Sequence, residues 1–127
     1  MTALPNLHDG FFDGVWLSPD KHARFFTRTA TGDRTTIALA GVEALNISGL
    51  RAGNIIFEVV LIAPEELTPK DIEQAYGLES DRVELAKQLL TKAQLQGLSA
   101  LAFNSSYGAE GMVLFHTVDV VPEHVLA

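Results

Sequence analysis

The chain has 127 residues, of which 16 are acidic and 9 are basic, so its formal net charge is −7. An acidic surface repels phosphate backbones, which argues against nucleic-acid binding and favours a basic protein partner. The chain has no cysteine, which excludes disulfides, thiolate zinc sites and cysteine nucleophiles. Its length and its 47% hydrophobic content predict a single globular domain over residues 1–127.

The first ten residues have neither the basic start nor the apolar core of a signal peptide. The longest apolar run is far shorter than the roughly 20 residues that a membrane helix needs. We therefore expect a cytoplasmic protein that makes no contact with a membrane.

The first half of the chain predicts four strands, over residues 11–17, 23–29, 35–40 and 43–48. Apolar side chains alternate with polar ones in these runs, as in strands with one buried face. Turn-forming residues separate the runs, at 18–21 around Pro19 and at 31–33 around Gly32. Successive hairpin-like connections indicate an antiparallel meander.

Residues 55–62 form an apolar run of strand length that is interrupted only by Glu58. Because neighbouring side chains of a strand point to opposite faces, this run needs cover on both sides. It therefore predicts a central strand that ends the meander before Pro64. Another layer is expected over the face that carries Glu58.

Two helices and two strands are predicted after this run. Thr68, Pro69 and Asp71 are typical of a capped helix start, and Gly77 would end that helix. Ser80 is predicted to cap a longer helix that ends near Gly97 and covers one face of the sheet. The last strands are expected over residues 98–104 and 111–120, and a tail from residue 122.

The fold class is therefore α+β, with an antiparallel meander of about six or seven strands and two helices inserted before the last two strands. The helices can cover only one face of this sheet. We expect the other face to be partly open or to be buried in a homodimer.

His8, Asp9 and Asp13 form the one cluster of histidine and carboxylate residues in the sequence. These side chains suit a divalent metal, but their spacing matches no established metal-site pattern. The alternative interpretation of residues 8–10 is a simple turn that leads into the first strand.

Glu58 has two interpretations. In a cleft, a carboxyl group with a raised pKa could act as a general acid or base. The alternative is a partly covered face, on which Glu58 meets water or pairs with Arg24 or Arg28 of a neighbouring strand.

Tyr107 and Glu110 lie in a predicted loop, where binding residues often occur, so they join Glu58, Arg24 and Arg28 as interaction candidates. No segment has the spacing of a nucleophile elbow, a phosphate-binding loop or a dinucleotide-binding loop. We therefore expect no cofactor and identify no catalytic residue.

Five short segments together resemble small bacterial proteins of largely uncharacterised families, some of which resemble immunity proteins of contact-dependent toxin systems. These segments are Leu7-His8-Asp9-Gly10, Arg24-Phe25-Phe26, Gly41-Val42-Glu43, Gly53-Asn54-Ile55-Ile56 and Ser105-Ser106-Tyr107-Gly108-Ala109-Glu110. The resemblance implies a compact α+β domain that neutralises a toxin, and it transfers no catalytic residue.

Three hypotheses about function follow from the sequence. The first is a non-catalytic binding protein, immunity-like, that holds a basic protein partner. The second is an enzyme that binds a small molecule or a metal through His8, Asp9, Asp13 or Glu58. The third is a structural subunit of a larger assembly.

Overall fold

The structure is a computed structural model, and it describes residues 4–122. Its strands are β1 (Phe11–Leu17), β2 (His22–Arg28), β3 (Arg34–Ala40), β4 (Ala44–Ser48), β5 (Ile55–Ile62), β6 (Ser99–Tyr107), β7 (Glu110–Phe115) and β8 (Thr117–Pro122). Its helices are the short 3-10 helix η1 (Pro64–Glu66) and the α-helices α1 (Pro69–Tyr76) and α2 (Val83–Leu95). The α+β class is confirmed, and the described residues form eight strands rather than six or seven.

All neighbouring strands are antiparallel, in the order β4-β7-β6-β5-β1-β2-β3-β8. Residues 55–62 do lie between two other strands, because β5 is placed between β6 and β1. The predicted cover on both faces of this strand is wrong, because only Ile56 is buried and Phe57, Glu58 and Val60 are exposed. The predicted meander is wrong beyond β3: the next strand, β4, lies at the far edge of the sheet and pairs with β7. Two sets of strands are consecutive both in the chain and in the sheet, namely β1, β2 and β3, and β5, β6 and β7.

The last predicted strand, residues 111–120, is in fact two strands that meet at a bend at His116. β7 pairs with β4 and β6, whereas β8 pairs with β3. The His116 N–H donates to the Ala40 carbonyl at 3.0 Å, so this bend lies against the connection from β3 to β4. Gly41 allows that close approach, because a Cβ atom there would lie 2.5 Å from the His116 ring.

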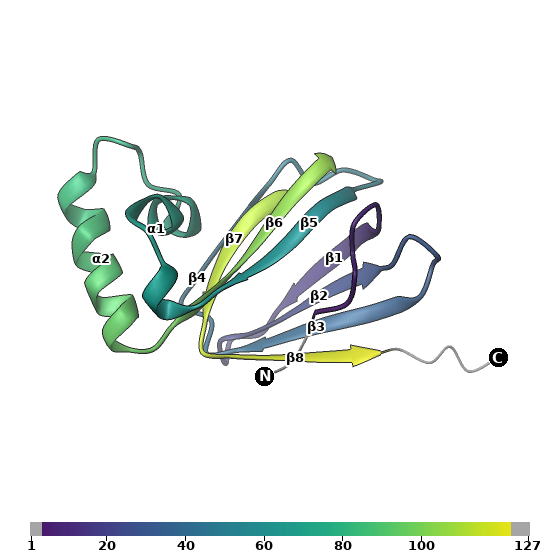
Figure 1. Cartoon of the computed structure of the whole chain (residues 1–127), viewed down its shortest axis with the longest axis horizontal. Helices are drawn as coiled ribbons and strands as arrows, with labels where there is room; N and C mark the ends of the chain where they lie inside the picture. The colour runs from purple at the N-terminus through teal and green to yellow at the C-terminus, as the bar shows by residue number, and fades with distance from the viewer. Residues whose placement is uncertain (1–3, 123–127) are drawn as a thin grey trace.

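The bend folds the sheet over itself. Figure 1 shows one layer formed by β4, β7, β6 and β5, and a second layer formed by β1, β2, β3 and β8. Pro122 is the last residue of β8 rather than the start of the predicted tail, and the rest of that tail lies outside the described residues.

The main core lies between the two layers of the folded sheet. Phe25 of β2 packs on Phe103 of β6 with 4.8 Å between ring centroids, and Phe12 of β1 contacts both rings. Leu101 of β6 and Phe115 of β7 are also buried in this core. The face of β6 and β7 that the helices do not cover was expected to be partly open or to be buried in a homodimer. It is instead covered by the other half of the same sheet.

A second core lies between the helices and the opposite face of β6 and β7. Ile72 of α1 and Ala86 and Ala93 of α2 are buried there against Ala100 and Met112, among others. The predicted role of the long helix as cover for one face is confirmed. The helices gather beside this layer, away from β1, β2, β3 and β8 (Figure 1).

The start of α1 agrees with its sequence signal. The Thr68 hydroxyl accepts from the Asp71 N–H at 3.2 Å, and the Asp71 carboxylate accepts from the Thr68 N–H at 2.9 Å. The start of α2 differs, because the helix begins at Val83 and no side chain caps it. The Arg82 N–H donates to the Glu79 carbonyl, so Ser80 lies in a turn before the helix rather than at its cap.

This difference between the two helix starts can be measured. Thr68→Ala is expected to lower the free energy of unfolding by about 1 kcal/mol, because the Asp71 N–H in the first turn of α1 loses its partner. Ser80→Ala is the matched control and should leave the urea unfolding midpoint unchanged. Equal losses for both variants would contradict the observed start of α2.

Candidate functional site

The layer formed by β1, β2, β3 and β8 has an outer face that no helix of residues 4–122 covers (Figure 1). Trp16, Phe26 and Val121 lie on it with 47%, 36% and 45% of their surface exposed. Strand pairing places Arg24 beside Trp16 and Arg28 directly opposite Arg34 on the same face. We call this surface the arginine–aromatic face; it consists of Phe11, Asp13, Gly14, Trp16, Arg24, Phe26, Arg28, Arg34, Thr36, Ala38, Asp119 and Val121.

Specific contacts hold two of its arginines in place. The Arg28 Nε and Nη2 atoms donate to the two Asp13 carboxylate oxygens at 2.6 and 2.9 Å. The Arg28 guanidinium also lies 4.6 Å from the centre of the Phe11 ring, and the Arg24 guanidinium lies 5.6 Å from that of Trp16. The Asp13 carboxylate raises the pKa of Arg28 above its ordinary value, so this guanidinium stays charged.

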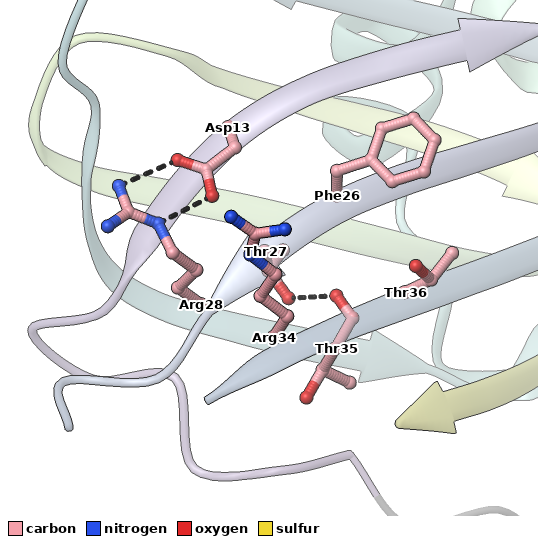
Figure 2. Close-up of a pocket in the computed structure, with 7 residues that line it drawn as sticks. All are labelled: Asp13, Phe26, Thr27, Arg28, Arg34, Thr35 and Thr36. Carbon is pink, nitrogen blue, oxygen red and sulfur yellow. Dashed lines mark hydrogen bonds and ion pairs between the residues drawn. The ribbon is translucent and has the colours of Figure 1, made fainter. Parts of the chain in front are cut away.

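A hollow of about 470 Å³ lies at the end of this face where β2 joins β3 (Figure 2). Asp13, Phe26, Arg28 and Arg34 line it, together with Thr27, Thr35 and Thr36. The Arg34 side chain makes no hydrogen bond and no ion pair with any residue from 4 to 122. The hollow therefore contains one paired cation and one cation without a described partner.

The predicted cluster of His8, Asp9 and Asp13 does not assemble. His8 Nε2 lies 3.5 Å from the Asp9 carboxylate, and His8 Nδ1 donates to the Phe57 carbonyl at 2.7 Å, but Asp13 binds Arg28. Across residues 4–122, no three histidine or carboxylate side chains are placed to hold a metal ion. The alternative is confirmed: Asp9 has a positive φ of 61°, and the Gly10 N–H donates to Leu7 in a turn.

Glu58 lies on the exposed face of β5, where it accepts a hydrogen bond from the Asn104 amide at 3.0 Å. The hypothesis that it pairs with Arg24 or Arg28 is wrong, because both arginines lie on the other layer and contact Trp16 and Asp13 respectively. The β5–β6 pairing is irregular between Ile56 and Glu58, which leaves the side chains of residues 57 and 58 exposed.

Tyr107 and Glu110 lie at the turn between β6 and β7. The Tyr107 ring is exposed and lies 5.5 Å from the Arg51 guanidinium. Glu110 lines a small polar hollow together with Asn104, the residue that binds Glu58. The interaction candidates are therefore divided, with Arg24 and Arg28 on one layer and Glu58, Tyr107 and Glu110 on the other.

Sequence reasoning missed the role of Arg34 and of the exposed Trp16. A signal for Arg34 was available in the turn at residues 31–33, because a tight turn sets the register of the strands that flank it. Arg28 and Arg34 are equally distant from Thr31, and that symmetry pairs them in the structure. In β2, Arg24, Phe26 and Arg28 alternate with Phe25 and Thr27, and two arginines at this spacing indicate a solvent-facing side.

Comparisons of the chain with protein-family models, with curated proteins and with solved structures give no match. Among the described residues, no helix is both long and apolar enough to cross a membrane. The assignment of a function therefore depends on the surface chemistry of the chain itself.

Proposed function

We propose that this protein is a non-catalytic binding domain that uses an acidic surface to hold a basic protein partner. The observation that carries the proposal is the unequal distribution of charge. Residues 58–84 contain eight acidic and two basic residues, whereas residues 11–40 contain three acidic and four basic residues. The negative charge is thus concentrated around η1, α1 and the start of α2.

Most of these carboxylates are available to a partner. Glu65, Glu66, Glu79, Asp81 and Glu84 are all exposed. A surface of one charge sign raises the rate at which an oppositely charged protein associates. We call the exposed residues between positions 58 and 84, which include Glu58, the acidic helical surface.

Tyr76 and Val83 are exposed hydrophobic side chains next to the helical carboxylates of the acidic helical surface. Tyr76 at the end of α1 is 38% exposed, and Val83 at the start of α2 is 48% exposed. Partial burial and the charge of Glu43 raise the pKa of Tyr76, so its hydroxyl remains a hydrogen-bond donor at neutral pH. Tyrosine is enriched among the few residues that supply most of the binding energy of protein interfaces, so Tyr76 is a candidate anchor for a partner.

The placement of the candidate catalytic groups favours binding over catalysis. Asp13 is held by Arg28, and Glu58 is exposed and bound by Asn104. Asp13 and Glu58 lie on different layers of the sheet, so they do not converge on one substrate. His8 and Asp9 lie 3.5 Å apart, but both side chains are exposed in the turn before β1. An immunity-like role is the specific form that we favour, in which the basic partner is a toxin.

The proposal predicts that binding depends on charge. For a partner captured from the native host and then purified, Glu79→Gln with Asp81→Asn should slow association about tenfold at low salt. Asp20→Asn with Asp119→Asn removes the same charge from the opposite layer and is the matched control. Stopped-flow or surface-based kinetics at several salt concentrations measures both variants.

Two outcomes would contradict the proposal. One is an association rate that is equally insensitive to salt and to the Glu79 and Asp81 substitutions. The other is a captured partner that is itself acidic and binds through the arginine–aromatic face.

The predicted homodimer is a second candidate, favoured by the exposure of Trp16 and Phe26 on that face. Two-fold packing of this face would bury the Arg28 and Arg34 side chains of both copies in one interface, and the repulsion between like charges there opposes association. Light scattering distinguishes the monomer from the homodimer, because the monomer has a mass of 13.8 kDa.

A further inference from the structure

We propose that the hollow between Asp13, Phe26, Arg28 and Arg34 binds the carboxylate or phosphate group of a small organic anion, whose apolar part rests on Phe26. This site lies on the arginine–aromatic face, and the acidic helical surface lies on the other layer (Figure 1). It therefore goes beyond the proposed binding of a basic protein.

The first argument is the charge of the hollow. Arg28 and Arg34 are directly opposite each other on paired strands and face the same side. Like charges in this arrangement repel, and Asp13 neutralises only one of them. A bound anion would supply the missing negative charge in a chain whose net charge is −7.

The second argument is the supply of hydrogen-bond donors. Asp13 occupies the Nε and Nη2 atoms of Arg28 and leaves Nη1 directed away from it (Figure 2). None of the three side-chain nitrogens of Arg34 has a hydrogen-bond partner among residues 4–122. Guanidinium groups bind planar carboxylates and phosphates through paired N–H donors, so the hollow offers donors suited to these anions.

The third argument is the shape of the hollow. Its volume of about 470 Å³ is within the range of small-molecule sites. Figure 2 shows the Phe26 ring on the same side of the strands as Asp13, with Arg34 also directed to that side. The Thr27 hydroxyl donates to the Thr35 carbonyl at 2.7 Å, which holds the underlying strands together. A ligand with a charged group and a flat apolar group fits this combination.

The test is titration of the purified chain, followed by calorimetry and by amide chemical shifts. The probes are phenyl phosphate, benzoate, inorganic phosphate and benzylamine. The two aromatic anions should bind at least about fivefold more tightly than inorganic phosphate, because only they can contact Phe26. Benzylamine has the ring but a positive charge, so it should show no saturable binding. Phenyl phosphate and benzoate together show which anionic group is preferred.

Two variants change the charge of the hollow in known directions, and a third variant is the control. Arg34→Gln should weaken phenyl phosphate binding at least about threefold, and it should fold normally because Arg34 has no described partner. Asp13→Asn should strengthen binding, because it removes the carboxylate that competes for Arg28. Arg82→Gln removes the same charge from a distant exposed position and should have no effect.

Weaker phenyl phosphate binding by Arg34→Gln together with stronger binding by Asp13→Asn would support the site. The proposal is overturned if Arg34→Gln and Arg82→Gln bind phenyl phosphate equally, or if the shifted amides lie outside β1, β2 and β3. Weaker binding by Asp13→Asn would also overturn it. A circular dichroism spectrum of each variant verifies that the fold is retained.

Discussion

Asn54→Ala should lower the free energy of unfolding by about 4 kcal/mol, because four hydrogen bonds are lost together and the backbone groups that made them are left without a partner. The Asn54 amide oxygen accepts from the N–H groups of Arg51 and Ala109, at 2.9 and 3.0 Å. Its amide nitrogen donates to the carbonyls of Phe12 and Arg51, at 3.2 and 2.9 Å. Asn54 is 5% exposed and its contacts with Phe12 and Ala109 are buried, so water cannot replace those two hydrogen bonds.

This one side chain connects the start of β5 to β1 and to the turn between β6 and β7. Asn104→Ala is the matched control, because the Asn104 amide is exposed and makes one hydrogen bond to Glu58. Urea unfolding should show a loss below about 1 kcal/mol for the control. A loss for Asn54→Ala that is no larger than this would show that the amide does not stabilise the junction.

Phe25→Ala is expected to be as damaging, with a loss of about 4 kcal/mol, because it leaves a cavity between the two layers. Phe25 is fully buried and packs on the Phe103 and Phe12 rings. The neighbouring residue on the same strand provides the control. Phe26 points outward to the arginine–aromatic face, and Phe26→Ala should lose less than about 1 kcal/mol.

Thermal or urea unfolding of both phenylalanine variants measures the difference directly. The pair differs only in which face of β2 loses its ring, so unequal effects identify the buried face. Equal losses would contradict the description of the sheet as folded over its own core.

Local signals in the sequence predicted the elements that depend on neighbouring residues. The capping box of Thr68 and Asp71 predicted the start of α1, and the apolar run at residues 55–62 predicted a central strand. The first three strands also follow from short turns. These features are local because helix caps and hairpins form within a few residues.

The features that were not predicted depend on residues far apart in the chain. Val113 and Phe115 point into the main core, but beyond the bend it is Val118 that packs there, so the alternation of faces changes at His116. An alternation of side chains between two faces, continued through residue 116 without a change, predicts one strand instead of two. The position of β4 beside β7 depends on the same bend.

The candidate site was predicted in part. Arg24 and Arg28 were identified as interaction candidates, and both lie on the exposed face of β2. One interpretation paired Glu58 with Arg24 or Arg28, whereas these arginines contact Trp16 and Asp13 respectively. Which carboxylate meets an arginine depends on the order of strands in the sheet. That order places β5 beside β1 and leaves Glu58 on the opposite layer.

The outermost strands have a consequence for self-association through backbone pairing. Exposed strand edges recruit other chains into extended sheets, and proteins limit this with short edges, charges and proline. The edge strands β4 and β8 have five and six residues. α1 is tied to β4 by a hydrogen bond from the Asn46 amide to the Gln74 carbonyl, and β8 carries Asp119 and ends at Pro122. Concentrated solutions should therefore resist the growth of fibrils, even though nearly half of the chain is apolar.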